Sequence, residues 1–114
     1  MTREDARDAM DRARARLARE AAAYAFGVDA AEIAAPTRRS ARTALARQVA
    51  MYLTHVAFEL SLSRTALAFG RDRTTAAYAC HRIEDRRDDA AFDALLDDLE
   101  ACLRSAPTPD RAAA

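Results

Sequence analysis

Four polar side chains share one face of a helix that is predicted to begin after Asp72, namely Thr74, Thr75, Tyr78 and Arg82. The opposite, apolar face consists of Ala76, Cys80 and Ile83. Hydroxyl and guanidinium groups can contact base edges in a major groove, and the free N–H groups of a helix N-terminus attract phosphates. This pattern predicts a DNA-contacting face, although Thr and Asp also suit the first turn of any helix and Tyr78 could pack on a neighbouring helix.

The residues before this helix complete a helix-turn-helix pattern. Ser63 is predicted to cap a short helix over residues 64–69, and Gly70-Arg71 forms the turn. Asp72 then caps the longer helix, which begins at Arg73 and extends to about residue 87. Ser63 and Arg64 start the first of these helices, which in a helix-turn-helix crosses the DNA backbone.

The other elements are also helical. Helices are predicted over residues 4–26, 30–35, 41–60 and from residue 90 onwards, and we identify no strand and no internal repeat. The apolar stripe of the first helix is predicted to be Met10, Ala13, Leu17, Ala21 and Tyr24. The fold class is therefore all-α, a small helical bundle with a helix-turn-helix. We expect residues 1–14 to be an N-terminal helical extension, residues 15–104 the DNA-binding domain and residues 105–114 a disordered tail.

Charge is segregated along a chain whose formal net charge is zero. All 18 basic residues are Arg, and residues 36–87 carry ten of them against four acids. Residues 88–114 carry two Arg against seven acids. A basic middle segment suits a polyanion, because phosphate binding releases counterions.

Several function classes are not supported by the residues. No apolar run reaches the roughly 20 residues of a membrane span, and no secretory signal is present. Cys80 and Cys102 have no metal-ligand spacing and are both predicted to be small core residues, and the His55/Glu59 pair lacks a third ligand. No catalytic grouping or glycine-rich phosphate loop is found, so we expect no enzyme, cofactor, metal or small-molecule substrate, and a cytoplasmic location.

Several short motifs, taken together, resemble one known domain. The segments ARQVAMYL (46–53), AFGRDRTT (68–75) and ACHRIE (79–84) agree in order and spacing with the C-terminal DNA-binding domain of the bacterial chromosomal replication initiator DnaA. The resemblance covers roughly residues 15–104. It implies a helical domain that binds a short repeated box at the replication origin.

The resemblance also assigns roles to individual positions. Arg39 matches a loop arginine that enters the minor groove, and Arg47 matches an arginine that contacts the DNA backbone. In this family a short signature motif contacts bases and phosphates in the major groove. The residues at the matching positions are Asp72, Arg73, Thr74 and Thr75. The complete predicted DNA-binding set is Arg39, Arg42, Arg47, Ser63, Arg64, Arg71, Asp72, Arg73, Thr74, Thr75, Tyr78 and Arg82. The alternatives are that Arg39 and Arg42 lie in a solvated loop, and that Arg47 forms an ion pair with an acidic residue of the closing helix.

Two departures from the family pattern bear on specificity. A single Gly70 precedes Arg71-Asp72 where the family has two glycines, and Arg73 replaces the signature histidine. We expect an altered or weakened sequence preference. Because these 114 residues contain no nucleotide-binding glycine cluster, we expect no ATPase activity.

The sequence thus predicts double-stranded DNA binding at sites like the initiator box, with an effect on replication initiation and association with the nucleoid. One alternative is a protein-interaction module that titrates a regulator of the initiator through the acidic last helix (Asp93, Asp97, Asp98 and Glu100). The other alternative is a transcription factor at unrelated operators.

Overall fold

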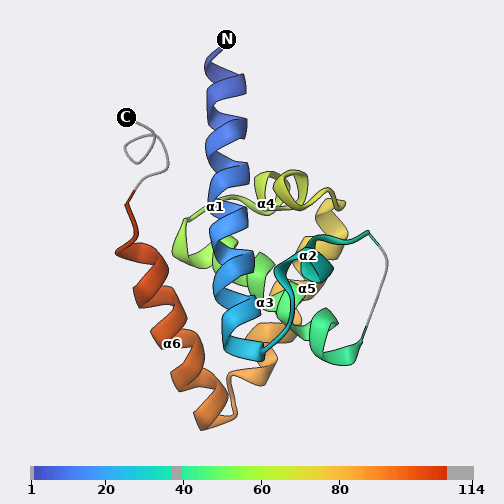
Figure 1. Cartoon of the computed structure of the whole chain (residues 1–114), viewed down its shortest axis with the longest axis vertical. Helices are drawn as coiled ribbons and strands as arrows, with labels where there is room; N and C mark the ends of the chain where they lie inside the picture. The colour runs from blue at the N-terminus through green and yellow to red at the C-terminus, as the bar shows by residue number, and fades with distance from the viewer. Residues whose placement is uncertain (1, 37–39, 108–114) are drawn as a thin grey trace.

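A computed structural model describes residues 2–36 and 40–107, and within them every regular element is a helix (Figure 1). The six helices are α1 (Arg3–Phe26), α2 (Ala30–Ala34), α3 (Ala41–Ala57), α4 (Leu62–Phe69), α5 (Arg73–Arg86) and α6 (Ala90–Arg104). The all-α prediction is confirmed. None of these helices is both long and apolar enough to span a membrane.

Helix α3 is the central element of the core. Its residues Val49, Ala50 and Leu53 are completely buried, and α1, α5 and α6 all pack against it. Continuous apolar positions on several sides of one helix are expected when that helix is surrounded by others.

The buried face of α1 differs from the predicted stripe. Ala15, Ala18 and Ala22 are fully buried, whereas Leu17 is 38% exposed and Tyr24 is 90% exposed. The predicted stripe was wrong, because helical spacing alone does not distinguish between two alanine-containing faces of similar polarity. Small alanine side chains allow the α1 backbone to approach α3 closely, so the alanine face packs inwards and the larger side chains lie outside.

The helix caps largely follow the sequence. Asp29, Ser40, Asp72 and Asp89 each accept a hydrogen bond from a main-chain N–H in the first turn of the following helix, and Gly27 ends α1 in the left-handed conformation. These side chains supply the hydrogen bonds that the first turn of a helix lacks.

The segment between α3 and α4 is where the predicted boundaries were wrong. Helix α3 ends at Ala57, before a left-handed Glu59 with φ 59°, and Nδ1 of His55 lies 2.6 Å from the carbonyl oxygen of Leu60. Ser61, rather than Ser63, caps α4, because its Oγ accepts from Arg64 N–H at 3.1 Å. The helix therefore starts two residues earlier than predicted, and it includes Leu62, which packs against the core.

The first half of α1 extends beyond the rest of the bundle (Figure 1). It is one continuous helix with the packed half, and Asp11 attaches it to α4. Arg64 Nε and Nη2 donate to the two carboxylate oxygens of Asp11 at 2.8 and 2.6 Å. This bidentate pair fixes α4 relative to α1.

Candidate nucleic-acid interface

The turn between α4 and α5 depends on the backbone conformation of Gly70. Its φ of 64° and ψ of 33° lie in the left-handed region, which glycine adopts without a Cβ penalty. The N–H of Arg71 donates to the carbonyl of Ala66 at 2.9 Å, which closes the end of α4. The single glycine of this turn is therefore sufficient to end one helix and start the next.

The orientation of α5 agrees with the predicted wheel. Its inward side chains are Ala76, Ala79 and Ile83, at most 1% exposed, and Cys80, 8% exposed. Its outward side chains are all exposed, and they are Arg73, Thr74, Thr75, Tyr78 and Arg82. The hydroxyl and guanidinium groups at the start of α5 thus face away from the bundle.

Asp72 is exposed beside these groups, but its carboxylate is used within the helix. Its Oδ1 accepts from Thr75 N–H at 2.8 Å. This hydrogen bond lowers the pKa of Asp72, because it stabilises the charged form. The exposed Arg73, by contrast, has no carboxylate partner among the described residues.

Arg47 is buried rather than presented to solvent. Its Nε donates to the Ile33 carbonyl at 2.8 Å, and its Nη2 donates to the carbonyls of Glu32 and Ala35 at 3.0 and 3.3 Å. Burial, and then repulsion from Arg71, lowers the pKa of Arg47. This geometry favours a role for Arg47 in holding the end of α2.

Arg71 and Arg64 also make intramolecular contacts. Arg71 Nη2 donates to the Ala35 carbonyl at 3.0 Å, so that α2, α3 and the turn before α5 are joined through one main-chain segment. Arg64 binds Asp11, and Ser63 is exposed on α4. Arg39 lies outside the described residues.

The two remaining predicted arginines have no carboxylate partner in the described part of the chain. Arg42 is exposed in the first turn of α3. Arg82 is exposed and its guanidinium carbon lies 5.9 Å from the ring centroid of Tyr78. Both are available to an external anion.

Sequence reasoning did not find the role of Arg87. Its guanidinium contacts carboxylates of Asp93, Asp97 and Glu100 on α6, and it donates to the Tyr52 hydroxyl at 3.0 Å. The sequence feature that could have indicated this role is the pair Arg86-Arg87 directly before an acidic helix. This cluster also shows that three of the four acidic groups on α6 are already paired.

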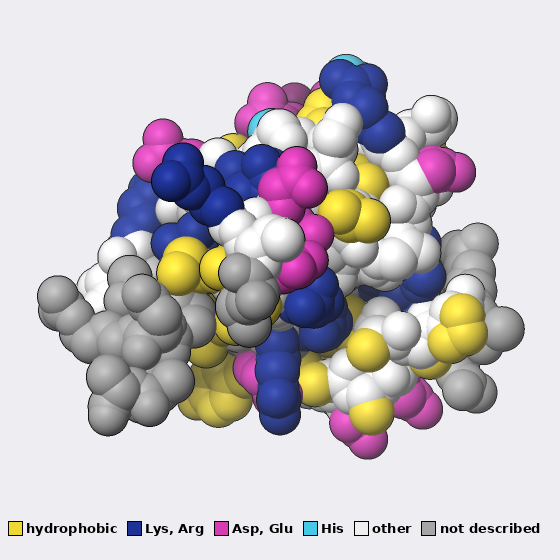
Figure 2. Space-filling view, turned by 90° about the horizontal axis from the view of Figure 1, so that it is seen from above, with side chains coloured by type: hydrophobic (Ala, Val, Ile, Leu, Met, Phe, Trp, Pro, Cys, Tyr) yellow, Lys and Arg dark blue, Asp and Glu magenta, His cyan; other side chains and the backbone are white. Residues whose placement is uncertain are grey.

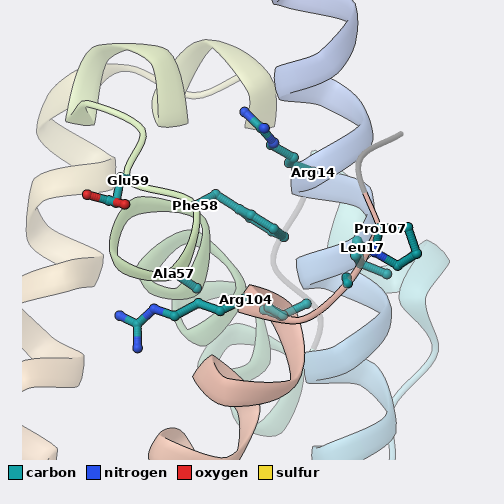
Figure 3. A pocket seen from close by; sticks show the side chains of 9 residues that line it. Arg14, Leu17, Ala57, Phe58, Glu59, Arg104 and Pro107 are labelled. Atoms are coloured by element: carbon teal, nitrogen blue, oxygen red, sulfur yellow. The ribbon is translucent and has the colours of Figure 1, made fainter. Parts of the chain in front are cut away.

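The face at the projecting end of α1 is mixed in charge. Figure 2, which views the molecule from that end, shows basic and acidic side chains next to each other. A hollow of about 300 Å³ lies between α1, the end of α3 and α6 (Figure 3). Arg14 lies there 5.8 Å from the Phe58 ring centroid, and none of the predicted DNA-contacting residues lines this hollow.

Cys102 is a correction to the predicted core. Cys80 is buried as expected, but Cys102 is exposed on α6. The buried residues of that helix are Leu96, Glu100 and Leu103, which places position 102 outside the packed face. Among the described residues, no group of three or more His, Cys, Asp or Glu is arranged to hold a metal ion.

Comparison with known proteins gives consistent matches. The model of the bacterial DnaA protein helix-turn-helix family matches residues 15–83. Chromosomal replication initiator proteins DnaA of Tropheryma whipplei, strains Twist and TW08/27, are each 45% identical over 47 residues, which are 41% of this chain and 10% of theirs. A crystal structure of a DNA replication initiation factor superposes with a TM-score of 0.76 at 29% identity, covering 88% of this chain and 31% of that one. The chain thus spans only a minor part of these relatives.

Proposed function

The chain belongs to the family of the bacterial DnaA helix-turn-helix domain, and we propose that it binds double-stranded DNA at sites like the box of the replication initiator. The observation that carries this proposal is the exposed start of α5. Arg73, Thr74 and Thr75 face outwards there, while the neighbouring Asp72 carboxylate accepts a hydrogen bond from its own helix. An N-terminus of this kind fits the recognition helix of a helix-turn-helix.

We assign base contacts to Arg73, Thr74 and Thr75. Arg73 offers a planar fork that suits guanine, and the threonine side chains can meet bases or phosphates. We propose that Tyr78 and Arg82, one and two turns further along, contact the DNA backbone. Arg42 and Arg39 are assigned to phosphate and minor-groove contacts.

The proposed biological effect is on replication initiation, by occupying initiator boxes or competing for them. We propose that the chain does this on the nucleoid and without ATPase activity. Its two glycines, Gly27 and Gly70, each end a helix, so neither belongs to a phosphate-binding loop.

The test is binding to initiator-box duplex and to a scrambled duplex at moderate salt, measured by fluorescence anisotropy. We expect Arg73→Ala and Thr74→Ala to reduce the preference for the box by about 1–3 kcal/mol per lost base contact. The matched control is Arg3→Ala, which removes one exposed charge at the far end of α1. Wild-type binding that does not distinguish box from scrambled duplex, or that neither variant weakens, contradicts the proposal.

The two alternative functions, an interaction module and a transcription factor, are tested by separate measurements. Capture of a purified regulator of the initiator, unaffected by Arg73→Ala, would support an interaction module. The acidic surface of α6 is a weaker candidate for this, because Asp93, Asp97 and Glu100 bind Arg87. A genome-wide map of bound sites with peaks at promoters and none at the origin would instead indicate a transcription factor.

A further inference from the structure

Two adjoining grooves lie between α3 and α5. The first, of about 420 Å³, begins beside Thr75 and Arg71 at the start of α5. The second, of about 380 Å³, reaches Arg42 and Arg86. Both are lined by Ala44, Gln48 and Arg82, so we treat them together as the α3–α5 trough.

The charged residues that line this trough are all arginines. No Asp or Glu of the described chain lines either groove, whereas acidic residues line each of the other hollows described for the molecule. Asp85 and Asp89 lie just beyond its end, in the hollow on the far side of Arg86. The trough is therefore a cationic strip with a defined end.

The arginines of the trough differ from their neighbours in how they are paired. Arg87 contacts three carboxylates, while the guanidinium carbon of the adjacent Arg86 lies 5.1 Å from the Phe92 ring centroid and Arg86 forms no ion pair within residues 2–36 and 40–107. Arg42 has no carboxylate partner among the described residues either. Arg47 and Arg71, at the other end of the trough, donate to main-chain carbonyls, so Arg42 and Arg86 are the trough arginines that we assign to an external anion.

We propose that the α3–α5 trough binds the phosphate backbone of DNA flanking the site read by the start of α5, with Arg42 and Arg86 as its outer contacts. The proposal rests on the proposed function and deepens it. Helix α5 has 14 residues and is about 21 Å long, which is the rise of about six nucleotides of one strand. A duplex strand leaving the recognition site along α5 would meet these arginines in turn.

The test compares two duplexes that carry the same initiator box. One duplex ends at the box, and the other is extended by about six base pairs on each side. We measure Kd against salt concentration for wild type, Arg42→Gln and Arg86→Gln. On the extended duplex, we expect each variant to lower the slope of log K against log salt by about 0.9. On the short duplex, we expect Arg86→Gln to match wild type, because the phosphate assigned to Arg86 lies outside that duplex.

Two further variants separate charge from structure. Arg86→Lys keeps the charge and should restore the salt slope, while Arg3→Gln removes an exposed charge elsewhere and should leave it unchanged. Far-UV circular dichroism of each variant confirms that the exposed substitutions leave the fold intact.

The inference is overturned if both glutamine variants behave like Arg3→Gln on the extended duplex, or if Arg86→Gln weakens the short and extended duplexes equally. Binding of poly-glutamate provides a second criterion. The inference is also overturned if the trough variants lose poly-glutamate binding while their salt slope on the extended duplex stays at the wild-type value. The ligand of the trough would then be an acidic protein. These results differ from failure of the proposed function, because in that case the wild-type protein itself does not bind the initiator box more tightly than a scrambled duplex.

Discussion

The role of each arginine is set by what surrounds its guanidinium. Arg47 donates to carbonyls at the end of α2, Arg64 to Asp11, and Arg87 to three carboxylates of α6. Arg73 and Arg42, by contrast, are exposed without a carboxylate partner among the described residues. A buried guanidinium must satisfy its donors within the protein, whereas an exposed one can exchange water for phosphate.

Replacement of Arg47 should affect stability before it affects DNA binding. Arg47→Met leaves the carbonyls of Glu32, Ile33 and Ala35 without their donor, and we expect the free energy of unfolding to fall by about 2–4 kcal/mol. Urea denaturation measures this. The control is Arg16→Met on the exposed face of α1. A stable Arg47→Met variant with a reduced salt slope for DNA would instead assign Arg47 to a phosphate contact.

The two cysteines should differ in reactivity. Burial, and then the charge of Glu84, raises the pKa of Cys80 to about 11, and the side chain is 8% exposed. Cys102 is exposed. We expect iodoacetamide near neutral pH to label Cys102 quickly and Cys80 only slowly, because the thiolate is the reacting form. Mass spectrometry of the native protein measures this difference, and equal labelling in urea is the control. Equal rates in the native protein would contradict the buried position of Cys80.

At the level of secondary structure, short polar side chains and glycines define where helices begin and end. Asp72 starts the recognition helix and Gly70 ends the helix before it. These local interactions involve residues within five positions of each other, so their partners do not come from the rest of the bundle.

The cap at Asp72 should make the start of α5 sensitive to acid. The hydrogen bond from Thr75 N–H lowers the pKa of Asp72 from its usual 3.8, so the charged form stabilises the folded helix above that pH. This contribution is lost as the pH falls through the lowered value. We expect amide exchange at Thr75 to rise, relative to a mid-helix amide of α5, over that acidic range.

A matched pair of variants isolates this effect. Asp72→Ser keeps a capping oxygen but has no titrating group, so its Thr75 amide should show no acid-dependent change of this kind. Asp72→Ala should show rapid exchange at every pH. If Asp72→Ser follows the wild-type pH profile, another group causes the change.

The complete fold is held together by contacts between residues distant in sequence. Arg87 joins α5 to α6 through Glu100 and to α3 through Tyr52, and Asp11 joins α1 to α4 through Arg64. Together these pairs surround the α3 core and leave the start of α5 facing outwards. These pairs neutralise arginines of the scaffold, whereas Arg73 at the start of α5 has no carboxylate partner among the described residues.

Loss of Arg87 should loosen the attachment of α6. The side chain of Arg87 is 17% exposed and that of Glu100 is 11% exposed. Arg87→Gln leaves Asp93 and Asp97 without a cation and leaves Glu100 with Arg104 alone, at 3.1 Å. We expect the free energy of unfolding to fall by about 2–4 kcal/mol. Urea denaturation followed by circular dichroism checks this value, and the adjacent Arg86→Gln is the control. Equal stability of the two variants would show that the cluster contributes little.

Patterning along the chain was sufficient to predict the helices, most caps and the outward face of α5. These features depend on spacing within a few residues and on a strong apolar face, as at Ala76 and Ile83. The same patterning misplaced the buried face of α1, because an alanine-rich helix has two faces of similar polarity. The choice between them depends on how closely α1 can approach α3, which is a property of the partner surface.

The amino-acid sequence specified an all-helical chain with a helix-turn-helix, and it identified the residues that face away from α5. The pairing of each arginine, however, was set only when the chain was folded. Arg47 meets carbonyls 12 to 15 residues away, and Arg64 meets a carboxylate 53 residues away. Such pairs depend on how the helices pack against each other. The spacing of residues along one helix does not indicate which distant charges come into contact in the folded chain.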